Sequence, residues 1–150
     1  VVTFNDFIDN EIAGYLHLSS YAQFHNNNFE GNNVHLELDN MSYDWELRAS
    51  KKPKRNRQMQ NESLAKQGRT ERKEIQVDVK SEGFVDAVGN YWGLETTQEM
   101  DIKGPDKNIT GFIDGFDVPI LTYDGWPGEY KKDRVRYADW IKQRIPETGP

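Results

Sequence analysis

The sequence predicts an all-β protein: an antiparallel β-sandwich with a polar basic loop over residues 51–73 and a C-terminal helix or arm over residues 129–145. Short stretches alternate apolar and polar residues, the period of a half-buried strand. Turn residues separate these stretches at intervals of about 8–12 residues, which is typical of a sandwich. Neither an internal repeat nor the strand–helix alternation of a doubly wound sheet is evident.

The length of 150 residues indicates a single domain. Within it we expect an N-terminal arm or irregular segment over residues 1–33, a sandwich core over residues 34–128 and a helical arm over residues 129–150. Apolar residues make up 35% of the chain, and its 4 Trp, 7 Tyr and 7 Phe supply large rings for a core. No apolar run is long enough for a membrane-spanning helix. With 0 Cys, disulfides, cysteine-ligated zinc and thiol catalysis are excluded.

The N-terminal segment mixes aromatic residues with Asp and Asn and has no clean period. Part of it fits a short helix, with Asn5 or Asp6 as the N-cap and Ile8, Ile12 and Tyr15 on one face. The stretch over residues 25–33, rich in Asn and Gly, is typical of a loop.

The alternating pattern becomes clear at residues 34–39 and continues after a turn at Trp45 and Leu47, which together predict a β-hairpin. Further strands are expected over residues 75–79 and 91–94, and another beginning at residues 109–112. Pro119 interrupts the next apolar run and indicates an edge strand or a bulge. Over residues 129–145 the apolar side chains fall on one side of a helix that ends at Pro146.

Charge is distributed unevenly along the chain. The formal net charge is -6, yet residues 51–73 hold nine bases and only two acids. Such a block can meet anionic lipid headgroups, with Lys54, Arg55 and Arg57 as candidate contacts, or it can be a solvated loop. The block disfavours nucleic acid as a partner, because it contains no aromatic residue for base stacking.

Aromatic residues near turns are candidates for membrane or ligand binding, because their rings combine an apolar body with a polar tip. The candidates are Tyr91, Trp92, Tyr123 and Trp126. Trp126 is the strongest, because Gly125 and Pro127 place it in a turn. The alternative for Trp92, as for Trp45, is an ordinary place in the core.

Three stretches together resemble the aegerolysin family, which includes insecticidal crystal toxins: VHLELDNMSYDWEL, IQVDVKSEGFVDAVGNYWGLE and ITGFIDGFDVPILTYDGWPGE. The resemblance spans residues 34–128. It implies a small β-sandwich that binds a membrane lipid surface, is not an enzyme and needs no cofactor. It also implies secretion and a role as one component of a cytolytic, pore-forming toxin, with a second protein as partner.

Other functions remain open. Exposed rings also suit a carbohydrate-binding or adhesion module, and a structural subunit that forms homo-oligomers is a further alternative. A metal-dependent hydrolase or nuclease would use Asp78 and Lys80, with Glu74 upstream. Asp114, Asp117 and Asp124 fit a calcium site only loosely. The three His residues lack zinc-site spacing, so no metal site is expected. Three glycosylation sequons begin at Asn40, Asn61 and Asn108.

Overall fold

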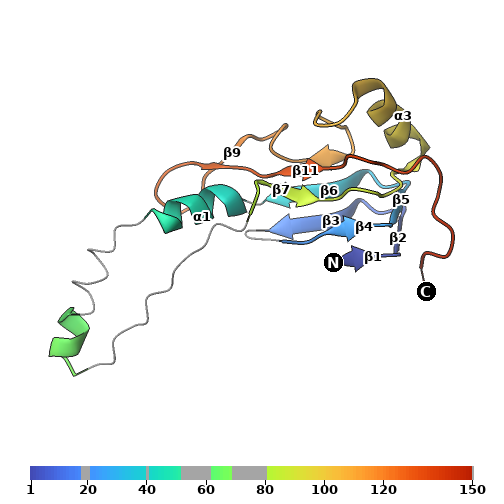
Figure 1. Ribbon diagram of the computed structural model, residues 1–150. Coiled ribbons are helices and arrows are strands. Elements are labelled where there is room, and N and C mark those ends of the chain that lie inside the picture. The colour runs from blue at the N-terminus through green and yellow to red at the C-terminus, as the bar shows by residue number, and fades with distance from the viewer. Residues whose placement is uncertain (18–20, 40, 52–61, 69–80, 150) are drawn as a thin grey trace.

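The computed structural model describes residues 1–17, 21–39, 41–51, 62–68 and 81–149 (Figure 1). Most of its regular elements are short β-strands, so the β-rich character predicted from the sequence is confirmed. Among the described residues, no helix is long and apolar enough to cross a membrane.

The first two turns of the chain form two stacked coils that follow the same path. Coil 1 contains β1 (Val2–Thr3), β2 (Asp6–Ile8) and β3 (Ile12–His17). Coil 2 contains β4 (Phe24–His25), β5 (Asn28–Glu30) and β6 (Val34–Asp39). Each strand of coil 1 pairs in parallel with its counterpart in coil 2, always with a residue 22 positions later. We use "coil 1" for residues 2–17 and "coil 2" for residues 24–39.

Two further coils extend this stack. Coil 3 (residues 84–113) contains β7 (Phe84–Asp86), α3 (Gly93–Lys103) and β8 (Phe112–Ile113), and β8 pairs in parallel with β6. Coil 4 (residues 134–141) begins with β11 (Arg134–Arg136), which pairs in parallel with β7. Figure 1 shows the layers rising from β1 to β11. This is the arrangement of a parallel β-solenoid, in which each coil buries its apolar side chains against its neighbours.

The remaining elements flank the stack. The chain between coils 2 and 3 includes α1 (Ser42–Ser50) and a short helical stretch over residues 62–66. After coil 3, β9 (Ile120–Leu121) pairs antiparallel with β10 (Tyr130–Lys131), and β10 packs on α1. The C-terminal residues return to coils 1 and 2, where the side-chain amide of Asn28 exchanges hydrogen bonds with the backbone of Ile145 (2.8 and 2.9 Å).

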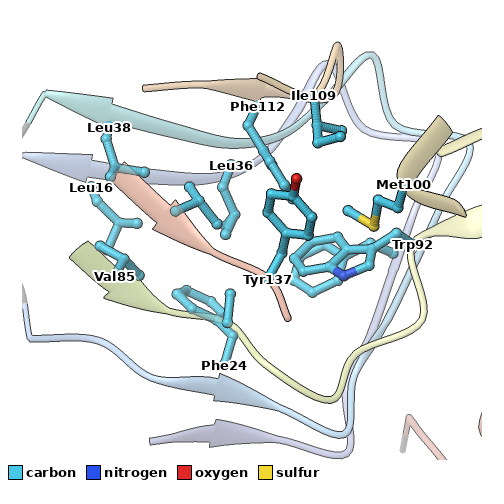
Figure 2. Close-up of a cluster of buried hydrophobic side chains, with 13 residues drawn as sticks. Leu16, Phe24, Leu36, Leu38, Val85, Trp92, Met100, Ile109, Phe112 and Tyr137 are labelled. Carbon is cyan, nitrogen blue, oxygen red and sulfur yellow. The ribbon is translucent and has the colours of Figure 1, made fainter. Parts of the chain in front are cut away.

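The interior of the solenoid is lined by side chains that repeat from coil to coil. Phe7, Phe29 and Trp92 stack in successive coils, with ring centroids 4.6 and 4.5 Å apart and planes tilted by 9° and 20°. Leu16 lies in the same way beside Leu38, its counterpart in coil 2. Figure 2 shows Leu16, Leu38 and Trp92 converging with Met100 of α3 and Tyr137 of coil 4 on one apolar core. The core therefore forms only because the coils stack.

A row of asparagines joins the coils at one corner. The side-chain oxygen of Asn27 accepts the backbone N–H of Asn5 (3.0 Å), and that of Asn90 accepts the backbone N–H of Asn27 (2.9 Å). Asn27 and Asn90 are completely buried, so these bonds satisfy polar groups that water cannot reach.

The predicted antiparallel sandwich is not confirmed. Of the strand pairs among the described residues, β9–β10 is antiparallel and the other five are parallel. The alternating pattern reports that a strand has one buried face, but it does not report the direction of its neighbour. The internal repeat that was not evident from the sequence is present as the 22-residue offset between coils 1 and 2.

The prediction of a helix over residues 129–145 is wrong. Residues 130–131 and 134–136 are strands, and no helix occurs up to residue 149. Val135 and Tyr137 are buried while Arg134 is exposed, so this stretch follows the two-residue period of a strand. Its apolar residues fit a helical period by coincidence of spacing.

Other local predictions also need correction. Residues 1–33, expected to form an arm with a short helix and a loop, contain β1 to β5. Trp45 and Leu47 lie in α1 instead of a strand, and the expected strand over residues 91–94 is a single bridge at Tyr91 followed by α3. The expected strand over residues 75–79 and most of the basic loop lie outside the described residues.

Candidate functional site

The outer face of β3 and β6 carries an open group of polar and aromatic side chains. Leu16 and Leu38 point into the core, so the residues beside them in each strand point to solvent. In β3 these are Tyr15, which is 55% exposed, and His17. In β6 they are Glu37 and Asp39, paired opposite Tyr15 and His17.

Asp39 is the centre of this group. Its Oδ2 lies 2.7 Å from Nδ1 of His17 and 3.4 Å from the hydroxyl of Tyr15, and its Oδ1 accepts a hydrogen bond from the hydroxyl of Tyr123 (3.0 Å). These bonds bring together two coils and the segment between β9 and β10. We call Tyr15, His17, Asp39, Tyr123 and Trp126 the Asp39 cluster.

Hydrogen bonding to Asp39 fixes the proton positions in the cluster. Burial and the neighbouring Asp39 raise the pKa of both Tyr15 and Tyr123, so both phenols stay protonated and donate to the carboxylate. The ionised carboxylate can only accept, so Nδ1 of His17 carries the proton shared with it. The other ring nitrogen of His17 is then left to a ligand or to water, since the side chain is 54% exposed.

Trp126 extends the cluster along the protein surface. Its ring is 5.6 Å from that of Tyr123 and 5.9 Å from that of Tyr130, centroid to centroid. The guanidinium of Arg48 lies 4.3 Å from the centre of the Tyr130 ring and pairs with Asp44 (2.8 Å), which ties the segment to α1. Trp126 is nevertheless 41% exposed. The cluster therefore offers ring faces, acceptors and donors side by side.

A second polar region is a hollow of about 250 Å³ beside β7. Arg136 lies between Glu82 and Asp86 (3.7 and 3.6 Å) and its guanidinium stacks over Phe84 (4.0 Å). Charges pair in both regions, Arg136 with Glu82 and Asp86 here and His17 with Asp39 there, but the Asp39 cluster sets two exposed rings, Tyr15 and Trp126, beside its polar groups. The Asp39 cluster is therefore the better candidate site.

The structure separates the residues that the sequence singled out. Tyr123 and Trp126 are neighbours in the Asp39 cluster. Trp92 is fully buried in the interior stack and Tyr91 is 8% exposed, so neither ring is available at the surface. Lys54, Arg55 and Arg57 lie outside the described residues.

Sequence reasoning missed Tyr15, His17 and Asp39. The signal that could have found them is the 22-residue spacing, which places Tyr15 beside Glu37 and His17 beside Asp39. Without the repeat, His17 and Asp39 appear as unrelated polar residues of two different segments.

The loosely predicted metal ligands have other partners. Asp114 accepts backbone N–H groups of Phe116 and Val135 (2.8 Å each), and Asp117 accepts the side-chain amide of Asn108 (3.0 Å). In the described part of the chain, no three His, Asp or Glu side chains gather so as to hold a metal ion. The nuclease candidates Asp78 and Lys80 lie outside the described residues.

No family model, curated protein or solved structure matches this chain. The resemblance to aegerolysins, and the toxin, lipid-binding and secretion roles that it implies, therefore stay predictions.

Proposed function

We propose that the protein binds a carbohydrate chain on its outer face, through the Asp39 cluster. The observation that carries this proposal is the partly buried carboxylate of Asp39 (27% exposed), surrounded by the hydroxyls of Tyr15 and Tyr123 and the ring of His17. Such a group combines the two kinds of contact that a sugar needs. A pyranose has apolar C–H faces and a rim of hydroxyls that both donate and accept.

The rings supply the apolar contact. Tyr15 and His17 lie side by side with planes only 12° apart and centroids 6.2 Å apart, which gives two neighbouring rings of similar orientation on the sheet. Trp126 supplies a third, larger ring beyond Tyr123. Because the rings are spread from β3 to the segment between β9 and β10, they suit several successive sugar units better than one.

The polar groups orient the sugar through hydrogen bonds to its hydroxyls. Asp39 and Glu37 accept hydroxyl hydrogens as charge-assisted bonds, which are shorter and stronger than neutral ones. The ring nitrogen of His17 that faces away from Asp39 offers one more hydrogen bond. These carboxylates repel acidic sugars, so the preferred ligand is a neutral saccharide chain.

Membrane-lipid binding is the second candidate, favoured by the exposed Trp126 in its turn between β9 and β10. The acidic residues Glu37, Asp39 and Asp44 near this turn disfavour anionic headgroups. Binding to such a surface would have to come from Arg48 and Lys131 beside this turn, or from bases outside the described residues.

Affinity gel electrophoresis with soluble neutral polysaccharides (a β-glucan, a xylan and a galactomannan) tests the proposal. We expect at least one of them to retard the protein. Trp126→Ala and Asp39→Ala should each raise the apparent Kd about tenfold, the loss of one good contact. Tyr21→Ala is the matched control, because Tyr21 is similarly exposed (53%) but lies beside the β7 hollow.

Salt dependence distinguishes the two candidates. The affinity for a polysaccharide should be nearly unchanged between about 0.05 and 0.5 M salt, whereas binding to phosphatidylserine vesicles through bases weakens as screening increases. Retardation by none of the polysaccharides, or equal retardation of Trp126→Ala and the parent protein, would reject the proposed sugar site. Salt-sensitive vesicle binding in its place would establish the lipid candidate.

A further inference from the structure

Two Asp–Gly dipeptides occur in the chain, at residues 114–115 and 124–125. In such a dipeptide the side-chain carboxyl group can react with the backbone nitrogen of the glycine without an enzyme. Glycine permits the reaction because it has no Cβ to obstruct the approach and restricts the backbone least. The structure places the two dipeptides in opposite surroundings, and these surroundings indicate which of them reacts.

The first dipeptide is held in place. Asp114 is 2% exposed, and its two carboxylate oxygens accept the backbone N–H groups of Phe116 and Val135, at 2.8 Å each. The N–H of Gly115, which contains the nitrogen that would react, donates to the carbonyl oxygen of Asp133 (2.9 Å). Reaction at residue 114 would therefore require several buried hydrogen bonds to break first.

The second dipeptide lies in the turn between β9 and β10. Asp124 and Gly125 are both exposed, and they are the central residues of a turn in which the N–H of Trp126 donates to the carbonyl oxygen of Tyr123 (3.1 Å). The φ angle of Gly125 is 78°, which is typical of the third position of a type II turn. No described residue lies within 4 Å of the place that a Cβ of Gly125 would take.

The reacting groups of this turn are also unpaired within the described structure. Neither the carboxylate of Asp124 nor the N–H of Gly125 makes a hydrogen bond to another described residue. Ring closure at residue 124 therefore breaks no buried contact, in contrast to ring closure at residue 114.

We propose that Asp124 is a site of spontaneous conversion to isoaspartate. The backbone nitrogen of Gly125 forms a bond to Cγ of Asp124, and the hydroxyl of the protonated carboxyl group leaves with the amide proton as water. Water then adds to the resulting cyclic imide. Cleavage at the side-chain carbonyl restores aspartate, whereas cleavage at the main-chain carbonyl gives isoaspartate. One water is lost and one is regained, so the mass is unchanged and no oxidant or reductant takes part.

The product changes the position of Trp126. Isoaspartate directs the main chain through Cβ and Cγ of residue 124 and so lengthens it by one carbon. The hydrogen bond between Tyr123 and Trp126 spans this point, and the Trp126 ring packs 5.6 Å from Tyr123 and 5.9 Å from Tyr130. We therefore expect the aged protein to bind polysaccharide more weakly. This consequence rests on the proposed function, whereas the isomerisation itself does not.

Peptide mapping of the full chain after prolonged incubation at neutral pH tests the proposal. Cleavage after aromatic residues places the two dipeptides in different peptides, because Phe116 and Tyr123 lie between them. Chromatography separates aspartyl from isoaspartyl peptides of equal mass, and an isoaspartyl methyltransferase labels the latter. We expect isoaspartate at residue 124 to accumulate at least about tenfold faster than at residue 114, because the bonds that hold Asp114 raise its barrier.

The variant Asp124→Glu is the matched control. It keeps the charge in the exposed turn, but its longer side chain would have to close a larger ring, so labelling of this peptide should fall by about tenfold or more. In concentrated urea the bonds around Asp114 are lost, and the two dipeptides of the parent protein should then react at similar rates.

Equal rates at residues 114 and 124 in the folded chain, no isoaspartate at residue 124, or undiminished labelling of Asp124→Glu would overturn the proposal. Affinity gel electrophoresis of fresh and aged protein separates it from the proposed sugar site. Isoaspartate at residue 124 in a protein that binds no polysaccharide even when fresh would leave the modification site established and reject the sugar site.

Discussion

Coils 1 and 2 follow the same backbone path, yet they contribute differently to the molecule. Their strands pair residue for residue, and their corners are alike: Phe4 and Asn26 have positive φ angles of 57° and 56°, as do their counterparts Gly89 and Asp139 in coils 3 and 4. Among the described residues, coil 2 lies between coils 1 and 3, whereas the strands of coil 1 pair with coil 2 alone. The comparison therefore separates the effects of a coil's own sequence from the effects of coverage by neighbouring coils.

The largest expected effect concerns the interior stack. Phe29→Ala removes a completely buried ring that packs against both Phe7 and Trp92, so it should lower the free energy of unfolding by about 3–5 kcal/mol. Phe7→Ala, the matched change in coil 1, should cost about half as much, because only one face of that ring is packed. Urea unfolding of both variants measures the difference. Equal losses would mean that the two rings contribute the same to stability, and that coverage by neighbouring coils does not distinguish them.

The next effect depends on pH and is confined to coil 2. His35 occupies the position of Ala13 in coil 1 and is 3% exposed. Burial lowers the pKa of His35 from 6.5 to about 4. Between these two values the unfolded chain binds the proton and the folded chain does not. The stability linked to His35 is therefore complete above pH 6.5 and is lost as the pH falls towards 4.

The variant His35→Gln isolates this effect. Between pH 7 and about pH 4.5 the parent protein should lose about 2–3 kcal/mol more than the variant does, the size set by the two pKa values. Unfolding by urea at each pH provides the measurement. Parallel pH profiles would show that His35 is protonated in the folded protein.

The smallest effect concerns the repeated corner. Phe4 adopts a left-handed backbone conformation that Asn and Gly tolerate better, and Asn26 and Gly89 occupy this corner in the next two coils. Because Phe4 is 56% exposed, little packing is lost on replacement. Phe4→Asn should therefore stabilise the protein by about 0.5–1 kcal/mol, seen as a higher thermal midpoint. A lower midpoint would show that the Phe4 ring makes a contribution that its exposure does not suggest.

Much of the local character was readable from the sequence. The alternation over residues 34–39 predicted β6, Pro119 indicated an edge strand or a bulge and lies directly before the short strand β9, and Trp126 was recognised as an exposed ring of a turn. Each of these depends on one residue or a few adjacent ones, which is the range over which turn chemistry and a two-residue period act.

The candidate site was only half predictable. Tyr123 and Trp126 were identified because turns expose rings, but Trp92 was placed with them and lies in the core. Its position is decided by Phe29, which stacks on it from a coil more than 60 residues earlier in the chain. No local pattern around Trp92 reports that contact.

By itself the sequence determined the β-rich character, the strand β6 and the turn that exposes Trp126, because these follow from neighbouring residues. Only the tertiary structure decided that the strands run parallel, that Asn5, Asn27 and Asn90 share one row, and that Asp39 gathers His17, Tyr15 and Tyr123. The physical reason is that these contacts depend on the offset between coils. That offset is set by packing inside the solenoid and not by any one segment.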